Sequence, residues 1–124
     1  AIKNNDNQIE VWGTGLATRE FCYVEEAADG IILAMERYNK SEPVNIGAGF
    51  EISIKDLVSL IVKITGFNGE VIWNRSKPDG QPRRMLDINR ARDEFGFIPK
   101  IAFEKGLAKT IDWYKNEIIN KNKQ

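Results

Sequence analysis

The spacing of apolar residues along the chain predicts three amphipathic helices. Side chains three and four positions apart form one stripe over residues 25–38, a second over 53–65 and a third over 103–119. The middle helix has the clearest ends, because Ser53 is a favourable N-cap and Gly66 can adopt the left-handed conformation that ends a helix.

Short apolar runs between these helices predict extended segments and one short helix. The predicted strands cover residues 9–12, 19–24, 44–46 and 70–73, and the short helix covers 89–95 with Asn89 as its cap. Because helices and strands alternate along the chain, the pattern predicts an α/β fold.

Size and composition indicate one packed domain spanning residues 1–124. Of these residues 42% are hydrophobic, which is typical of a globule rather than a disordered chain. The 18 basic side chains equal the 18 acidic ones, so we expect no nucleic-acid partner. No apolar run approaches the roughly 20 residues that span a bilayer, so we expect no membrane segment.

The side chains that most often carry catalysis are scarce. The chain has no histidine, which removes the commonest general base and the usual zinc ligand, and we expect no metal site. Cys22 is the single cysteine, so no internal disulfide can form, and this usage is typical of a reducing cytoplasm. Composition therefore predicts a cytoplasmic protein without a histidine-based catalytic pair.

The segment from Arg75 to Asp87 combines stiffness with positive charge. Residues 78–82 (P-D-G-Q-P) favour a rigid turn, because proline fixes its φ and glycine can adopt φ > 0. A stiff loop that carries Lys77, Arg83 and Arg84 suits phosphate binding, since little conformational entropy remains to be lost. The alternative, which the local sequence alone favours, is a basic turn that faces water.

A glycine-rich bend near the start of the chain separates an aromatic side chain from an arginine. Trp12 precedes Gly13 and Gly15, and Arg19 follows them. An indole offers a flat apolar face to a base or sugar ring, and a guanidinium matches the geometry of phosphate. Taken alone, Trp12 is better interpreted as a core side chain.

Two glycine pairs, at residues 13 and 15 and at residues 47 and 49, have the spacing that begins a dinucleotide-binding turn. Such a turn requires a third glycine, but Thr18 and Ile52 stand at those positions. We therefore expect both pairs to form tight turns and strand ends rather than a cofactor site.

Together, the bend and the stiff loop resemble a known family. The patterns W-G-x-G-x-x-x-R-E-F at residues 12–21 and S-K-P-D-G-x-P-R at 76–83 are similar to the carboxyl-terminal part of an extended short-chain dehydrogenase/reductase of the NAD-dependent epimerase/dehydratase family. Within that family the likeness is to the enzymes that convert GDP-4-keto-6-deoxy-mannose into GDP-L-fucose. The resemblance runs from about Glu10 to Tyr114. It implies a small mixed α/β substrate-binding domain, with the Rossmann half missing from this chain.

The resemblance implies a role for each candidate side chain. Arg19 and Arg84 would neutralise the diphosphate of a GDP-sugar, and Trp12 would pack beside that ligand. Asp79 would order its loop or accept a hydrogen bond from the ligand. Arg83 is an alternative to Arg84 that the sequence does not separate from it.

The resemblance also implies a division of labour. The family's cofactor fingerprint and its Tyr-x-x-x-Lys pair lie upstream of the matching region, so NADP would bind the full-length enzyme and no cofactor would bind this chain alone. We expect no catalytic residue here, because Ala27, Glu42 and Ile118 stand where lysine would follow the three tyrosines. The implied partners are a nucleotide-sugar substrate, the missing amino-terminal Rossmann half and further copies in a homo-oligomer.

In the resembled family the missing half covers the stretch that follows the arginine motif. We therefore expect an apolar surface without its natural cover, formed by Phe21, Val24, Ile31 and Ile32.

Three alternatives stay open at the level of function. The chain could serve a related 4-reductase, epimerase or dehydratase that acts on a CDP-, UDP- or dTDP-sugar. It could also be a stand-alone, non-catalytic sugar-nucleotide-binding module. The third, an RNA-associated scaffold, is disfavoured by the balanced charge.

Overall fold

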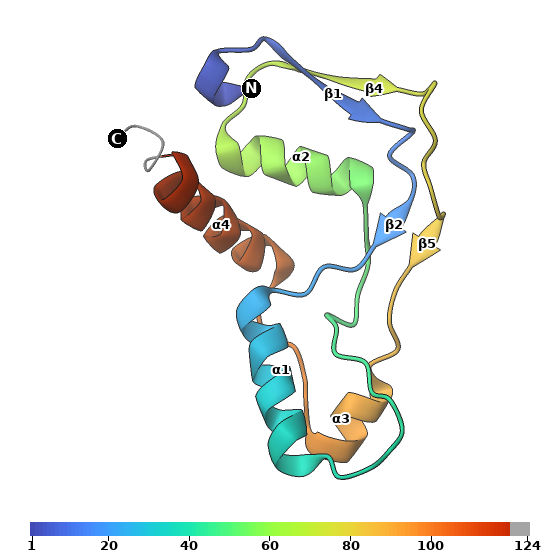
Figure 1. The fold of residues 1–124 in the computed structure, drawn as a ribbon. Coiled ribbons are helices and arrows are strands. Elements are labelled where there is room, and N and C mark those ends of the chain that lie inside the picture. The colour runs from blue at the N-terminus through green and yellow to red at the C-terminus, as the bar shows by residue number, and fades with distance from the viewer. Residues whose placement is uncertain (120–124) are drawn as a thin grey trace. The chain divides into compact units, whose positions relative to one another are not determined.

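The computed structural model describes residues 1–119, which form two compact units (Figure 1). The first unit, called unit 1, contains residues 1–19 and 52–84. The second, called unit 2, contains residues 20–51 and the chain from Met85 onward. Each unit is therefore assembled from two separate stretches of the sequence.

Unit 1 contains two small sheets. Strands β1 (Gln8–Trp12) and β4 (Glu70–Asn74) lie side by side and pair in parallel (Figure 1). In the second sheet, β2 (Thr18–Arg19) lies between β3 (Ile52–Ser53) and β5 (Arg83–Arg84). The central strand is antiparallel to β3 and parallel to β5. A short 3₁₀ helix (Ile2–Asn4) precedes β1.

The helix of unit 1, α2 (Ile54–Thr65), has the predicted ends. The Ser53 side chain accepts a hydrogen bond of 3.0 Å from the backbone N–H of Asp56. Gly66 follows the helix with φ of 70°, in the left-handed region. Both end signals act within one helical turn, which explains why the sequence predicted this element well.

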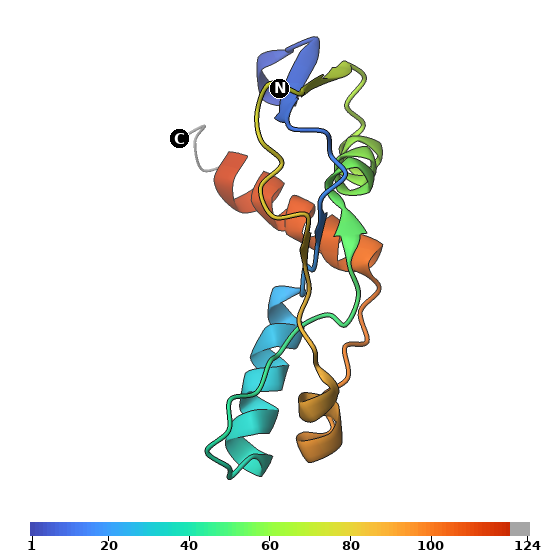
Figure 2. The same ribbon diagram turned by 90° about the vertical axis from the view of Figure 1, so that its right-hand side faces the viewer.

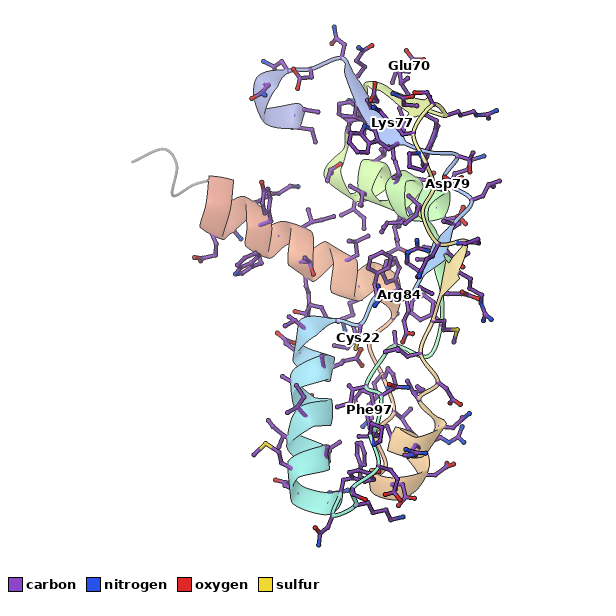
Figure 3. All side chains as sticks on the ribbon, turned by 45° about the vertical axis from the view of Figure 1, so that its right-hand side comes forward. Cys22, Glu70, Lys77, Asp79, Arg84 and Phe97 are labelled. Atoms are coloured by element: carbon purple, nitrogen blue, oxygen red, sulfur yellow. The ribbon has the colours of Figure 1, made fainter. Side chains whose placement is uncertain are left out.

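Unit 2 is helical in its regular structure. Helix α1 (Val24–Arg37) lies beside α3 (Asn89–Phe95), and α4 (Phe103–Tyr114) continues into a π-helical turn (Lys115–Ile119) (Figure 2). The buried centre of this unit comes from the end of α3 and the segment just after it, where Phe97 is labelled in Figure 3. Its members are Ala91, Phe95 and Phe97, with Leu33, Ala34, Tyr38, Val44 and Ile46 packed against them.

Three sequence predictions about local structure were wrong. The predicted strand over 19–24 is reduced to Thr18–Arg19, because α1 already begins at Val24. Residues 44–46 form no strand, since they have no strand partner within residues 1–119 and pack their apolar side chains into the core instead. Asn89 is the first residue of α3 rather than its cap, and its N–H donates to Asp87 Oδ1 at 2.9 Å.

The apolar surface expected on α1 is exposed. Val24, Ile31 and Ile32 are 70%, 55% and 52% exposed, and Phe21, just before the helix, is 38% exposed. The opposite side of the helix faces the core, where Gly30 leaves room for Phe97 and Ile46. No helix within residues 1–119 is long and apolar enough to cross a membrane.

Candidate functional site

All five side chains singled out from the sequence belong to unit 1. Trp12 is the last residue of β1, and Arg19 is the last residue of β2. Arg83 and Arg84 make up β5, and Asp79 lies on the loop between β4 and β5 (Figure 3). The fold therefore gathers residues from two distant parts of the sequence into one compact unit.

The strand register distinguishes Arg84 from Arg83. In the parallel pairing of β2 with β5, Arg84 is the partner of Arg19 and Arg83 is the partner of Thr18. Successive side chains of a strand point to opposite faces, so Arg19 and Arg84 emerge on the same face. The pairing thus brings two guanidinium-bearing residues together from loops that the sequence treats separately.

The Arg19 side chain is half-buried and held by its surroundings. Its Nη1 donates a hydrogen bond of 2.6 Å to the backbone oxygen of Thr18. Its Nη2 lies close to Gly80, where an added Cβ atom would stand 3.8 Å away. Arg84 is exposed. The two arginines therefore combine one positioned guanidinium with one that is open to solvent.

The carboxylate of Asp79 is engaged by a residue of the glycine bend. Its Oδ1 accepts from the backbone N–H of Thr14 at 2.5 Å, and its Oδ2 accepts from the Thr14 hydroxyl at 2.6 Å. The hydroxyl bond, followed by the backbone bond, lowers the pKa of Asp79 below its ordinary value. Sequence reasoning missed Thr14, although its place between two glycines marked the bend in which it lies.

Packing explains why glycine stands on both sides of Thr14. Gly13 has φ of 85°, and an added Cβ atom would collide with the carboxylate of Asp79. Gly15 has φ of 77°, and an added Cβ atom would come within 2.7 Å of the Trp73 ring. Both glycines are thus required by a left-handed backbone and by a close neighbour.

Trp12 is a surface residue and not part of the core. Its side chain is 65% exposed, and its Nε1 donates a hydrogen bond of 3.1 Å to Glu10 Oε1. The ammonium of Lys77 lies over the indole, 5.2 Å from the ring centroid. The interpretation of Trp12 as a core side chain is therefore wrong, and its flat face is accessible beside a cation.

In unit 2, the second glycine pair is tied to an acidic side chain that sequence reasoning missed. Glu20 Oε1 accepts hydrogen bonds from the backbone N–H groups of Ala48 and Gly49, the second at 3.1 Å. Its Oε2 accepts from the N–H of Leu86 at 2.6 Å. The signal available in the sequence was its place directly after Arg19 in the R-E-F motif.

Cys22 is half-buried in the segment before α1. Burial is the largest cause that raises the pKa of its thiol, and the carboxylates of Glu26 and Glu20 add to this effect. A thiol with a raised pKa is a weak nucleophile at neutral pH. Within residues 1–119, no group of three acidic or cysteine side chains is placed to hold a metal ion.

In chemical terms, unit 1 offers a pair of cations and an exposed aromatic face. The paired arginines can each donate two parallel hydrogen bonds to an oxyanion, and the exposed indole can cover a ring. Such an arrangement suits binding of an anionic ligand that carries a planar or apolar group.

Comparisons with known proteins identify similar sequences. The family model described as the NAD dependent epimerase/dehydratase family matches residues 1–47. The chain is 40% identical over 123 residues to the probable GDP-L-fucose synthase 1 of Oryza sativa subsp. japonica. This alignment covers 99% of this chain and 37% of that protein. It is 35% identical to the GDP-L-fucose synthase of Escherichia coli K12, covering 92% of this chain and 38% of that protein. The chain thus spans little more than a third of the length of these relatives.

Solved structures share the fold. A GDP-6-OMe-4-keto-L-xylo-heptose reductase from C. jejuni superposes with a TM-score of 0.80 and 32% identity, covering 90% of this chain and 34% of that one. A UDP-glucose 4-epimerase from Thermotoga maritima superposes with a TM-score of 0.78 and 28% identity, covering 87% and 35%. The predicted fold class, a small mixed α/β portion of an extended short-chain dehydrogenase/reductase, is confirmed. The chain is thus similar over nearly its whole length to part of the GDP-L-fucose synthases, and residues 1–47 match the NAD dependent epimerase/dehydratase family model.

Proposed function

We propose that this chain is the sugar-nucleotide-binding portion of an NADP-dependent epimerase/reductase that makes GDP-L-fucose from GDP-4-keto-6-deoxy-mannose. The observation that carries the proposal is the pairing of Arg19 with Arg84 in the unit that also exposes Trp12. The similarity to GDP-L-fucose synthases over nearly the whole chain supports the same assignment.

The two arginines would hold the diphosphate. Each guanidinium can meet one phosphate through two parallel hydrogen bonds, a geometry that lysine cannot reproduce. The register favours Arg84 over Arg83 for this role, because Arg84 shares a face with Arg19. Asp79, Gly80 and their neighbours would form the stiff loop that presents Arg84 to the ligand.

Trp12 would cover a ring of the ligand. The exposure of the indole and its contact with the ammonium of Lys77 support a surface role for this ring. A nucleobase or sugar could pack on this surface while Lys77 moves toward a phosphate as a point charge. The face of the ring and the nearby cations would then act on different parts of one ligand.

The chemistry and the cofactor are assigned to the part of the relatives that this chain does not span. None of the tyrosines in the sequence is followed four residues later by lysine, and histidine is absent. A related solved structure, a GDP-mannoheptose C4 reductase from Campylobacter jejuni that is 32% identical with a TM-score of 0.75, has NADP bound. By this proposal, NADP use, the Rossmann half and homo-oligomer formation belong to the full-length enzyme.

A second candidate function is suggested by other relatives. The UDP-glucuronic acid decarboxylase 1 of Xenopus tropicalis is 36% identical to this chain, covering 90% of it. Arg19 and Arg84, here called the arginine clamp, would hold a UDP-, CDP- or dTDP-sugar equally well, because each of these ligands carries a diphosphate. A non-catalytic binding module would also keep the clamp, but it would lack turnover at any length.

The test is a calorimetric titration of the protein at its full natural length with GDP, CDP, UDP and dTDP in turn. We expect GDP to bind most tightly, and Arg19→Ala to weaken GDP binding about 10- to 150-fold through loss of charge-assisted hydrogen bonds. Guanosine, which has no phosphate, is the control ligand and should respond little to the substitution. Tightest binding of another diphosphate would favour the second candidate. Equal GDP affinity of the variant and the wild type would overturn the clamp.

A further inference from the structure

We infer that Thr14 is a positioning residue for the arginine clamp, an inference that rests on the proposed function. By holding the carboxylate of Asp79, Thr14 fixes the loop that leads to Arg84 against the loop that leads to Arg19. Thr14 itself would not touch the ligand.

The two loops run between the same pair of sheets. They leave from the paired ends of β1 and β4, where Trp12 is the partner of Asn74, and they arrive at the paired strands β2 and β5. Backbone hydrogen bonds join them at both ends, from Gly13 N–H to Asn74 oxygen at 2.9 Å and from Thr18 N–H to Pro82 oxygen at 2.9 Å. The Thr14–Asp79 contact adds a side-chain tie between these two points.

The loops differ in length, so a backbone ladder cannot continue through them. Residues 13–17 form the shorter loop and residues 75–82 the longer one. The longer loop must therefore bulge, and the part near Asp79 and Gly80 depends on side chains for its position. Thr14 holds this part through two hydrogen bonds to one carboxylate.

The tied segment reaches the clamp directly. Gly80 follows Asp79, and an added Cβ atom on Gly80 would stand 3.8 Å from Nη2 of Arg19. The β5 strand that carries Arg84 begins just beyond Pro82. If this loop were mobile, Gly80 beside Arg19 and the segment that leads to Arg84 would both lose their fixed positions. Ligand binding would then carry the entropy cost of ordering them.

The contact also indicates how Asp79 would contribute. Both of its oxygens accept hydrogen bonds from Thr14, and a free carboxylate near a diphosphate would repel it. In this arrangement, Asp79 acts on the clamp through the loop rather than by contact with the phosphates. The loss of the Thr14 hydroxyl should therefore affect binding of the diphosphate and not binding of the nucleoside.

The experiment compares Thr14→Val with Thr14→Ser in the protein at its full natural length. Valine keeps the shape but removes the hydroxyl donor, and we expect GDP affinity to fall by about tenfold, the loss typical of one hydrogen bond to a charged group. Serine restores the donor and should return GDP affinity to within about twofold of wild type. Guanosine affinity should be the same in all three proteins, which distinguishes positioning of the clamp from general loss of structure.

A double-variant cycle with Arg19→Ala distinguishes the possible outcomes. If Thr14 acts through the clamp, Thr14→Val should weaken GDP binding much less when Arg19 is already absent. Equal losses in both backgrounds, equal loss of guanosine binding, or wild-type affinity in Thr14→Val would overturn the inference alone. Wild-type affinity in Arg19→Ala would overturn the proposed function and the inference with it. If Thr14→Val does not fold, Asp79→Asn, which removes one acceptor, must give the same pattern in a milder form.

Discussion

Arg19 is the direct partner of Arg84 across the parallel pairing of β2 and β5. Each of these strands is only two residues long, so few backbone hydrogen bonds hold the pairing. Like charges on one face repel each other unless an anion lies between them. The pairing is therefore the part of unit 1 that a bound diphosphate should stabilise most.

The register leads to a prediction that separates neighbouring arginines. Arg84→Ala should weaken GDP binding about 10- to 150-fold, because it removes charge-assisted hydrogen bonds from the face shared with Arg19. Arg83→Ala, which changes the same net charge on the other face, is the matched control and should cost less than about threefold. Titration calorimetry at low and high salt measures both effects, and the larger one should shrink as salt rises. A larger loss in Arg83→Ala would reverse the assignment.

A second prediction concerns the pH dependence of the Thr14–Asp79 contact. Hydrogen bonding lowers the pKa of Asp79 in the folded protein, with the Thr14 hydroxyl as the largest cause. The contact therefore contributes stability above the ordinary aspartate pKa of about 3.9, and this contribution is lost as pH falls through the lower, folded-state pKa. Thr14→Val should raise the Asp79 pKa toward its ordinary value, while Thr14→Ser should not. Carbon NMR of the carboxyl group between about pH 2 and 7 measures it, and an unchanged pKa in Thr14→Val would contradict the assigned cause.

A third prediction concerns Cys22. Burial and the carboxylates of Glu26 and Glu20 raise the pKa of its thiol, so less thiolate is present at a given pH than in an exposed cysteine. The folded protein should react with iodoacetamide at pH 8 more slowly than the same protein unfolded in urea. Because Cys22 is the single cysteine, the modified fraction in intact-mass spectra reports this site alone. Equal rates in the two states would show that the environment does not protect the thiol.

A fourth prediction concerns the exposed side of α1. Val24, Ile31 and Ile32 form an apolar surface that we propose is covered by the Rossmann half in the full-length enzyme. The 124-residue chain alone should therefore self-associate in analytical ultracentrifugation as concentration rises, and Ile31→Gln combined with Ile32→Gln should reduce this association.

Leu16→Gln is the matched control for that prediction. Leu16 is 73% exposed in unit 1, away from α1 in the sequence, so its replacement should leave the association unchanged. A wild-type chain that stays monomeric at high concentration would refute the idea that this surface needs a cover. So would equal effects of the Leu16 control and the α1 variant.

The elements that were predicted well from the sequence are those whose ends are determined by neighbouring residues in the chain. Ser53, Asp56 and Gly66 define both ends of α2 through contacts within a few residues, so no knowledge of the rest of the chain was needed. The strand predicted at residues 44–46 was wrong because a strand depends on contacts with distant residues. A strand requires a partner, and the apolar character of Val44 and Ile46 is equally well satisfied by packing against Phe97 and its neighbours.

The candidate site shows the same contrast. Motif resemblance selected Arg19, Asp79 and the arginine pair as candidates, but it did not separate Arg84 from Arg83. That choice depends on strand register, which places Arg19 opposite a residue far along the chain. Thr14 escaped notice because its partner lies 65 positions away, and neither residue alone indicates the contact.

The carboxylate of Glu20 is an internal anion that binds the backbone of the loop at residues 47–49. Successive backbone N–H groups in a glycine-containing turn form a concave nest that binds phosphate in many nucleotide-binding loops. In unit 2 a carboxylate from within the chain occupies this nest through the N–H groups of Ala48 and Gly49. The glycine-containing turn here fastens two stretches of polypeptide to each other. One acidic residue thus joins the loop at residues 47–49 to the segment at Leu86.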